Sequence, residues 1–177
     1  FRPSPDLEAY LDANGKPDLL EKVREVVRLA EVFEVRQDEA LGLGHAVLQA
    51  KPAVGDQDFA VLLGDDIIDS AQPAIAQLMA GRGEGQAVVA LMEVPHEETQ
   101  RYGVCAGEMI NRRRMAVSAM VEKPPPEEAP SRFAIVGRYV LPADIWGRLE
   151  ATKPGRGGEI QLTDAIASLA REGRVHG

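Results

Sequence analysis

The chain has 177 residues and a net charge of −8, with 45% hydrophobic and 27% charged residues. This length and composition are typical of one globular domain, so we expect a single domain over residues 1–177. The acidic balance repels nucleic acids and anionic lipids and argues against both as partners. No signal peptide or run of about 18 apolar residues occurs. The single cysteine, Cys105, excludes a disulfide framework and fits the reducing cytoplasm, and we expect it in the core.

The first 36 residues predict two helices and a strand. Pro5 and Pro17 each suit the first position of a helix, and Gly15 is expected to end the first helix. The second helix has apolar residues at helical spacing on one face and charged residues on the other. Apolar and polar residues alternate from Val32 to Arg36, which is typical of a strand.

A loop at residues 38–42 leads into a helix expected from Leu43 to Ala50, which Pro52 ends. Glycine at such a junction lets a ligand approach the backbone, where free N–H groups at the helix start can donate hydrogen bonds. A pair of glycines alone is more often only a turn. His45, at the start of this helix, is more often a surface or packing residue than a ligand.

The stretch from Val61 to Asp69 organises the rest of the prediction. It begins as an apolar run, which suits a strand buried on both faces of a parallel sheet. It then reaches Gly64 and the carboxylates Asp65 and Asp66. Ligands of open α/β sheets collect at the carboxyl ends of strands, and a carboxylate there suits Mg²⁺. An alternative is that these aspartates only cap the next helix, and the spacing alone does not decide between the two.

A helix expected at residues 73–80 and a strand at residues 87–92 continue the pattern. Strand–helix–strand repeats predict an α/β fold with a mainly parallel, mixed sheet flanked by helices. Residues 102–106 and 115–117 then resemble short antiparallel strands. The Asn111–Arg114 segment between them is interpreted as a solvated hairpin tip, in preference to a phosphate site.

The last third of the chain adds two strands and two helices. We expect strands at residues 119–123 and 134–141, the first broken by Pro124. A short helix at residues 142–149 and a final helix after Gly158 complete the prediction.

Four stretches, in this order and spacing, resemble the sugar-phosphate nucleotidyltransferase family. They are Arg36-Gln37 followed by Gly42-Leu43-Gly44-His45-Ala46, then Leu63-Gly64-Asp65, Tyr102-Gly103-Val104 and Val121-Glu122-Lys123-Pro124. Residues 134–141 and 158–166 are similar, more specifically, to the bacterial UTP–glucose-1-phosphate uridylyltransferases. The similarity runs from about Pro5 to the last residues. It implies the Rossmann-like architecture of nucleotide-diphospho-sugar transferases, which is also called GT-A-like.

The resemblance implies a nucleotide site with a metal ion. Gln37 would contact the uracil ring, and the backbone of Gly42 would contact the other edge of the base. Asp65 matches the aspartate that holds Mg²⁺ against the phosphates, and it is the first implied catalytic residue. The family varies at Asp66, whose role stays open, and Asp69 is taken as structural.

The resemblance also implies a sugar-phosphate site. Gly103 would let the hexose lie against the backbone, and Ile135 and Val136 would wall the sugar pocket. Glu122 would accept hydrogen bonds from sugar hydroxyls, and Lys123, the second implied catalytic residue, would bind the sugar phosphate. These residue types suit those roles. The alternative is a surface Glu–Lys ion pair worth about 0–1 kcal/mol, but Pro124 directly after the pair and the accompanying motifs favour the site.

The implied reaction is uridylyl transfer from UTP to glucose 1-phosphate, giving UDP-glucose and pyrophosphate. The family commonly forms homo-oligomers, so we expect dimers or tetramers. Its glycine-rich phosphate loop would precede Phe1 and its second metal-binding aspartate would follow Gly177, so we expect this chain to be an internal fragment that turns over poorly alone. The alternatives are a nucleotidyltransferase that uses dTTP, a glycosyltransferase, and a non-catalytic nucleotide-sugar-binding paralogue.

Overall fold

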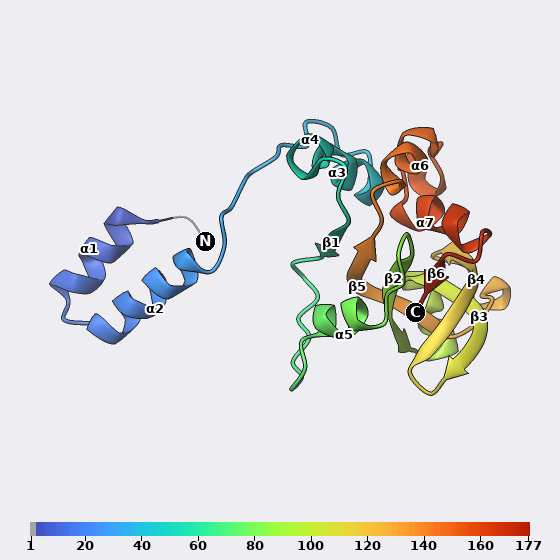
Figure 1. Ribbon diagram of the computed structural model, residues 1–177, viewed down its shortest axis with the longest axis horizontal. Helices are drawn as coiled ribbons and strands as arrows, with labels where there is room; N and C mark the ends of the chain where they lie inside the picture. The colour runs from blue at the N-terminus through green and yellow to red at the C-terminus, as the bar shows by residue number, and fades with distance from the viewer. Residues whose placement is uncertain (1–2) are drawn as a thin grey trace. The chain divides into compact units, whose positions relative to one another are not determined.

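The computed structural model describes residues 3–177 and divides the chain into two compact units, residues 1–36 and 37–177, which are described separately (Figure 1). A single domain over the whole chain stays a prediction. The first unit is a pair of helices, α1 (Pro5–Ala13) and α2 (Pro17–Arg28), each with proline near its first position as the sequence predicts. Glu8 and Arg24 form an ion pair of 2.9 Å between them.

The strand expected from Val32 to Arg36 does not form. The structure has extended chain without strand pairing there, and Phe33 and Val35 are exposed. A strand is defined by hydrogen bonds to a neighbouring strand, and alternation along the sequence cannot supply that neighbour. The prediction was wrong for this reason.

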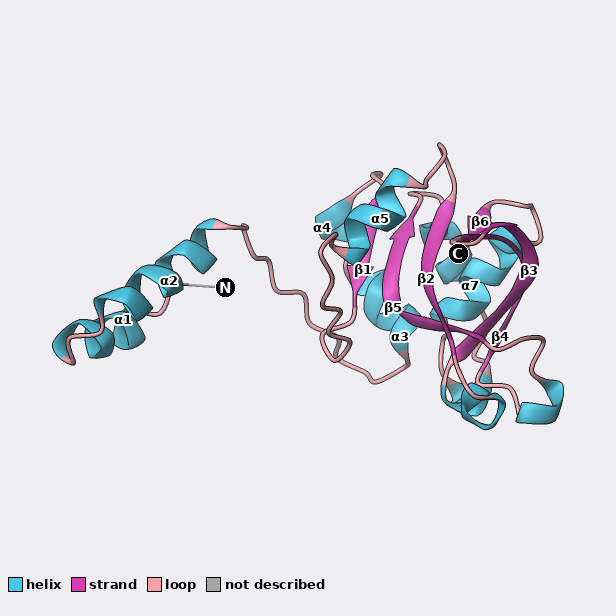
Figure 2. Cartoon of the chain, turned by 90° about the horizontal axis from the view of Figure 1, so that it is seen from below, coloured by secondary structure: helices cyan, strands magenta, loops and turns pink. Residues whose placement is uncertain are grey.

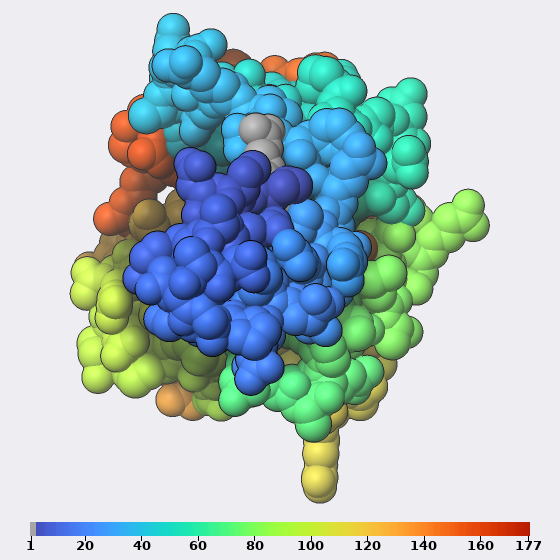
Figure 3. All heavy atoms as spheres, turned by 90° about the vertical axis from the view of Figure 1, so that its left-hand side faces the viewer, coloured from blue at the N-terminus to red at the C-terminus, as the bar shows by residue number. Residues whose placement is uncertain are grey.

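The second unit contains a six-stranded sheet in the order β1-β5-β2-β6-β4-β3 (Figure 2). Its strands are β1 (Phe59–Leu62), β2 (Ala87–Glu93), β3 (Gly103–Asn111), β4 (Arg114–Glu122), β5 (Phe133–Leu141) and β6 (Val175–His176). The strands expected at residues 115–117 and 119–123 are therefore one continuous strand, β4. The tip of the β3–β4 hairpin is exposed, as predicted, and stands out in yellow in Figure 3.

The α/β class with a mixed sheet is confirmed, but the expectation of a mainly parallel sheet is wrong. Among the described strands, only β2 and β6 pair in parallel. Both β1 and β2 are antiparallel to β5, which lies between them, so β1 and β2 point the same way. The strand–helix–strand pattern thus predicted their relative direction correctly. It could not reveal that a strand from much later in the chain would insert between them.

The central strand β5 changes partner along one edge. Arg138 to Leu141 pair with β1, whereas Phe133 and Ala134 pair with β3 on the same side. On its other edge, β5 pairs with β2 at both ends, with a register shift between the pairs Val89–Tyr139 and Leu91–Ile135. The expected organising strand is consequently short: β1 has four residues and pairs only with β5 among the described strands, and Leu62 is 54% exposed. The prediction of a strand buried on both faces was wrong.

Helices cover both faces of the sheet. The larger core lies under α3 (Leu43–Gln49), α6 (Ile145–Ala151) and α7 (Leu162–Ala170), and the smaller one under α5 (Ala74–Ala80). Successive residues of β2 alternate between the two cores, since Val89 belongs to the first and Val88 to the second. Pro52 does not end the helical region, because it lies in the first turn of a further short helix, α4 (Lys51–Val54).

Three further 3₁₀ turns connect these elements, at His96–Arg101, Pro126–Glu128 and Arg156–Gly158. Within the described part of the chain, every helix is too short or too polar to cross a membrane.

Two isoleucines at opposite extremes of burial test the importance of the larger core. Ile166 of α7 is 0% exposed, whereas Ile67 is 91% exposed. Ile166→Ala should lower the free energy of unfolding by about 2–5 kcal/mol, because it removes buried methyl groups and leaves a cavity. Ile67→Ala, the matched control, should change it by no more than about 0.5 kcal/mol. Urea unfolding followed by Trp146 fluorescence measures both, and equal effects would contradict the assignment of α7 to the core.

Candidate active site

The candidate site lies where β1 and β3 separate along the edge of β5. The last residue of β1 pairs with Arg138, and the pairing with β3 resumes only at Ala134. Ile135 and Val136 therefore border an interval in which neither strand is paired with this edge. This interval follows the carboxyl end of β1, and the carboxyl ends of strands are where ligands of open α/β sheets bind.

The turn that carries the predicted metal aspartate is anchored to β5 by Arg138. The guanidinium of Arg138 donates to the carbonyl oxygen of Leu63 at 3.0 Å and also to that of Asp66. The backbone N–H of Leu63 donates in turn to the carbonyl of Gly137 at 2.9 Å. Sequence reasoning gave Arg138 no role, since a single arginine inside a strand carries no local signal for binding a distant turn.

The two adjacent aspartates of this turn have different surroundings. The carboxylate of Asp66 occupies the position where a Cβ of Gly137 would lie, and Gly137 has a φ of +47°. A side chain at residue 137 would therefore collide with Asp66 and would be strained as well. Asp65 is exposed. The carboxylate of Asp66 is thus packed against β5, whereas that of Asp65 is accessible to a ligand.

The surroundings of Asp65 fit a metal that takes few protein ligands. In the described residues, no group of three or more His, Cys, Asp or Glu side chains is arranged to hold a metal ion. Zinc sites require three or four such ligands, whereas Mg²⁺ is held by one or two carboxylates together with water and substrate phosphates. An exposed carboxylate at the end of β1 fits the second kind of site.

The predicted sugar residues meet on the other side of the interval. Gly103 and Glu122 are register partners in β3 and β4. The side chain of Glu122 is 14% exposed and that of Lys123 is 47% exposed, with 3.7 Å between Glu122 Oε1 and Lys123 Nζ. Thr163, from α7, donates its hydroxyl to Glu122 Oε2 at 2.6 Å. Thr163 was missed by sequence reasoning, because it reads there as an ordinary helical residue.

Lys123 has an unusual backbone conformation. Its φ of +45° is positive, and no other non-glycine residue of the described chain shares this feature. Its backbone N–H donates to the carbonyl of Tyr102 at 2.9 Å, which holds it in place. Such a conformation is unfavourable for a residue with a Cβ, and strain of this kind gathers at functional sites.

Tyr139 connects the two sides of the interval electrostatically. Burial raises the pKa of its phenol above the usual range, and the charges of Glu122 and Asp66 raise it further. Both carboxylates therefore lie within electrostatic range of the same buried phenol. By contrast, burial alone raises the pKa of Cys105 to about 12, so this thiol stays protonated and belongs to the core, as expected.

The predicted base-binding residues form a third group. Gln37 Nε2 donates to the carbonyl of Gly42 at 3.3 Å and lies 3.0 Å from His45 Nδ1. Gln49 Nε2 lies 3.1 Å from His45 Nε2 on the other side of the ring. His45 was interpreted from the sequence as a surface or packing residue. In agreement with packing, the structure places its ring between two glutamine side chains, one of which is the predicted base contact.

The structure explains why glycine occupies positions 42 and 44, which the sequence did not reveal. Gly42 has a φ of +97°, and a Cβ on it would lie 2.6 Å from the Cβ of Glu159. The backbone N–H of Gly44 donates to the carbonyl of Ile160 at 2.8 Å. The space beside Gly42 is therefore filled by the segment before α7, and the Gly44 donor already has a partner. This packing agrees with the reading of the glycine pair as a turn, and the expected contact between the Gly42 backbone and a base stays a prediction.

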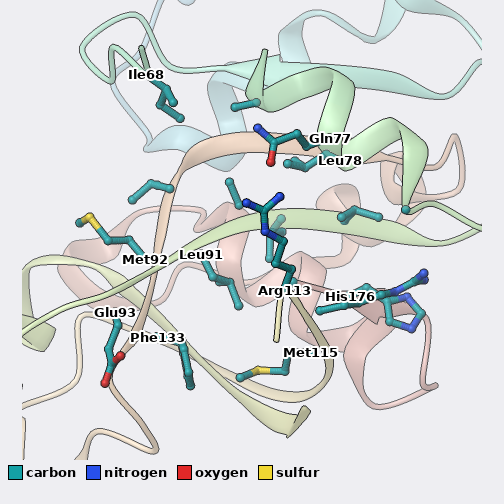
Figure 4. A pocket seen from close by; sticks show the side chains of 18 of the residues that line it. Ile68, Gln77, Leu78, Leu91, Met92, Glu93, Arg113, Met115, Phe133 and His176 are labelled. Carbon is teal, nitrogen blue, oxygen red and sulfur yellow. The ribbon is translucent and has the colours of Figure 1, made fainter. Parts of the chain in front are cut away.

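Ile135 and Val136 have different surroundings, and their expected part in the wall of a sugar pocket stays a prediction. Ile135 is buried in the larger core, with its Cδ1 3.0 Å from the place of a Gly103 Cβ. Val136 lines a hollow of about 850 Å³ on the α5 face, together with Asp66, Gln77 and Leu78 (Figure 4). Successive residues of a strand point to opposite faces, which explains the separation.

Comparisons with known proteins show the family of the chain. Residues 14–177 match the model of the family described as "Nucleotidyl transferase". The chain is 48% identical over 172 residues to UTP–glucose-1-phosphate uridylyltransferase 2 of Staphylococcus saprophyticus. The aligned region covers 97% of this chain and 60% of that protein.

Two solved structures are similar as well. A UDP-glucose pyrophosphorylase complexed with UDP-glucose matches with a TM-score of 0.85 and 37% identity, over 92% of this chain and 63% of that one. A UTP-bound enzyme of the same name from Acinetobacter baumannii matches with a TM-score of 0.81 and 39% identity, over 99% and 62% of the two chains. The chain thus spans about 60% of the length of the curated relatives it matches.

The backbone strain at Lys123 predicts that glycine is more stabilising than alanine at this position, the reverse of the usual order. Lys123→Gly should be more stable than Lys123→Ala by about 1 kcal/mol, because glycine adopts a positive φ without a Cβ penalty. At Glu108, an exposed position in the extended strand β3, the glycine variant should instead be less stable than the alanine variant. Chemical denaturation of the four variants measures both orders. If alanine were the more stable residue at both positions, the strain at Lys123 would be refuted.

Two glycines test the packing of the predicted base-binding group, because a side chain at Gly42 would meet neighbouring atoms and one at Gly147 would not. Gly42→Ala should lower the free energy of unfolding by about 1–3 kcal/mol, through strain at positive φ and collision with Glu159. Gly147, within α6, has nothing within 4 Å of its Cβ position, so Gly147→Ala should be neutral or raise stability by up to about 1 kcal/mol. Thermal unfolding compares the two, and a harmless Gly42→Ala would show that the contact with Glu159 is not required.

Proposed function

The chain belongs to the nucleotidyl transferase family, and on this premise we propose that its protein transfers a uridylyl group from UTP to glucose 1-phosphate, giving UDP-glucose and pyrophosphate. The observation that carries the proposal is the pair Glu122, a nearly buried carboxylate, and Lys123, a lysine with a strained backbone. This pair lies on one side of the unpaired interval of β5, and the turn that carries Asp65 lies on the other. Such a site offers an acceptor for sugar hydroxyls, a cation for a phosphate and a carboxylate for a metal within one fold. Relatives at 47% and 48% identity with the corresponding name support the choice of substrates.

The chemistry requires little from the side chains beyond positioning. A phosphate oxygen of glucose 1-phosphate attacks the α-phosphorus of UTP, a P–O bond forms, and the bond from that phosphorus to the bridging oxygen of pyrophosphate breaks. The nucleophile is already ionised near neutral pH, because a phosphate monoester has a second pKa of about 6. The site therefore needs no general base. Alignment of the two substrates and neutralisation of their charge supply the catalysis.

Each group of residues has a distinct part in this alignment. Glu122 accepts hydrogen bonds from the hydroxyls of the hexose. Lys123 directs its ammonium to the sugar phosphate, and its 3.7 Å separation from Glu122 leaves its donors available. Gln37 uses the outer end of its amide for the pyrimidine, because its Nε2 already donates to Gly42.

We assign the metal site to Asp65, which would hold Mg²⁺ against the phosphates of UTP. Bound there, the ion would neutralise the charge that develops on the phosphate oxygens. The carboxylate of Asp66 is packed against Gly137 and serves the shape of the turn in this proposal.

The activity test compares two aspartates of the same turn. For the protein expressed from the complete reading frame that encodes this chain, we expect Mg²⁺-dependent pyrophosphate release with glucose 1-phosphate, with UTP preferred over dTTP. Asp65→Asn should lower the rate by about 100-fold or more, because a group that stabilises charge in the transition state is lost. Asp69→Asn, an exposed aspartate that we give no role, is the matched control and should retain activity.

The possible outcomes separate the candidate functions. A preference for dTTP would keep the reaction and discard the assignment to uracil. Absence of release with either nucleotide, combined with binding of UDP-glucose, would refute transfer in favour of a nucleotide-sugar-binding protein. Transfer of glucose from UDP-glucose to an acceptor would identify a glycosyltransferase instead.

A further inference from the structure

We propose that Thr163 is a positioning residue, which orients the carboxylate of Glu122 toward the hexose through a hydrogen bond from α7. This inference deepens the proposed function and rests on it. Nothing in the amino-acid sequence around Thr163 indicates such a role, since the residue lies in the first turn of a buried helix, 41 positions after Glu122.

The contact has the geometry of a strong hydrogen bond. Thr163 Oγ1 lies 2.6 Å from Glu122 Oε2, within the range of a hydroxyl that donates to a carboxylate. Thr163 is 5% exposed, so water competes little for its hydroxyl. Threonine in a helix often bonds a carbonyl of its own preceding turn or caps the helix start. At α7, however, no side chain caps the helix, and the hydroxyl of Thr163 is directed to Glu122.

Thr163 determines how Glu122 presents its oxygens. It holds Oε2, whereas the ammonium of Lys123 lies 3.7 Å from Oε1, beyond hydrogen-bond distance. A glutamate side chain has three rotatable bonds and would otherwise sample several orientations. With Oε2 restrained, Oε1 keeps one direction and stays available to a sugar hydroxyl.

Gly103 gives independent support, because it fits the Thr163–Glu122 pair. A Cβ at residue 103 would lie 2.9 Å from Thr163 Oγ1 and 3.1 Å from Glu122 Oε2. Any larger residue would press on both atoms of the hydrogen bond at once. The absence of a side chain at Gly103 leaves room for this bond and for the Cδ1 of Ile135, which would lie 3.0 Å from the same Cβ. Gly103, Glu122 and Thr163, from β3, β4 and α7, form one unit.

The test compares Thr163→Val, which keeps the shape but removes the hydroxyl, with Thr163→Ser, which keeps the hydroxyl. Isothermal titration calorimetry on the protein encoded by the complete reading frame measures its Kd for UDP-glucose and for UDP, both with Mg²⁺. The parent should prefer UDP-glucose. Thr163→Val should weaken UDP-glucose by about tenfold, the effect of one lost hydrogen bond, and change UDP by less than about twofold. Thr163→Ser should restore most of the preference.

Kinetics provide a second reading of the same variants. The KM for glucose 1-phosphate should rise about tenfold in Thr163→Val while the KM for UTP stays constant, again by the loss of one hydrogen bond. A merely structural role would instead weaken UDP and UDP-glucose together, or would affect Thr163→Ser as much as Thr163→Val, and either result would overturn the inference. So would a Thr163→Val variant with an unchanged preference.

Failure of the proposed function has a different signature. A parent protein that binds neither ligand, or that binds UDP-glucose no better than UDP, would refute the sugar site itself and the role of Thr163 with it. Circular dichroism of the valine variant separates both results from a loss of folding.

Discussion

The segment from Glu159 to Thr163 is the constraint on which the candidate site depends. It exchanges backbone hydrogen bonds with the glycine loop, from Gly44 N–H to Ile160 O and from Ile160 N–H to Leu41 O, each 2.8 Å long. One turn later, Thr163 holds Glu122. The predicted base-binding and sugar-binding groups are thus attached to one short stretch of chain. That stretch runs into α7, which begins at Leu162 and is buried along most of its length. Burial of a helix behind the site is what gives the polar residues in front of it fixed positions.

The central strand β5 has a comparable part on the other side. Its first residues pair with β3 and its last residues with β1, so a single strand sets the distance between the sugar residues and the aspartate turn. Arg138 ties that turn to β5 through backbone carbonyls, which makes the anchoring independent of the side chains of the turn. The chain can therefore expose Asp65 to a ligand without loss of order in the loop that carries it.

How much of this could be predicted from the sequence depends on how local each signal is. The helix starts at Pro5 and Pro17 and the buried strand β5 follow from local preferences and were predicted correctly. The insertion of β5 between β1 and β2 joins residues about 80 positions apart, as in the pair Phe59 and Leu141, and no local pattern encodes it. The same holds for the site. Glu122 and Lys123 were recognised by resemblance to a family, whereas Thr163 and Arg138 act only through contacts that folding creates.

The ring of His45 lies between Gln37 and Gln49, and this simple arrangement has a consequence for hydrogen-bond direction. A neutral imidazole carries one N–H and one lone-pair nitrogen, so it cannot accept from both amides. Gln49 Nε2 also donates to the backbone carbonyl of His45, and Gln37 Nε2 donates to that of Gly42, so each amide has a further reason to turn its donor toward the ring. The tautomer of the ring therefore decides which of the two amides can donate to it. Gln49, a full helical turn beyond His45, thereby shares in deciding which end of the Gln37 amide faces outward.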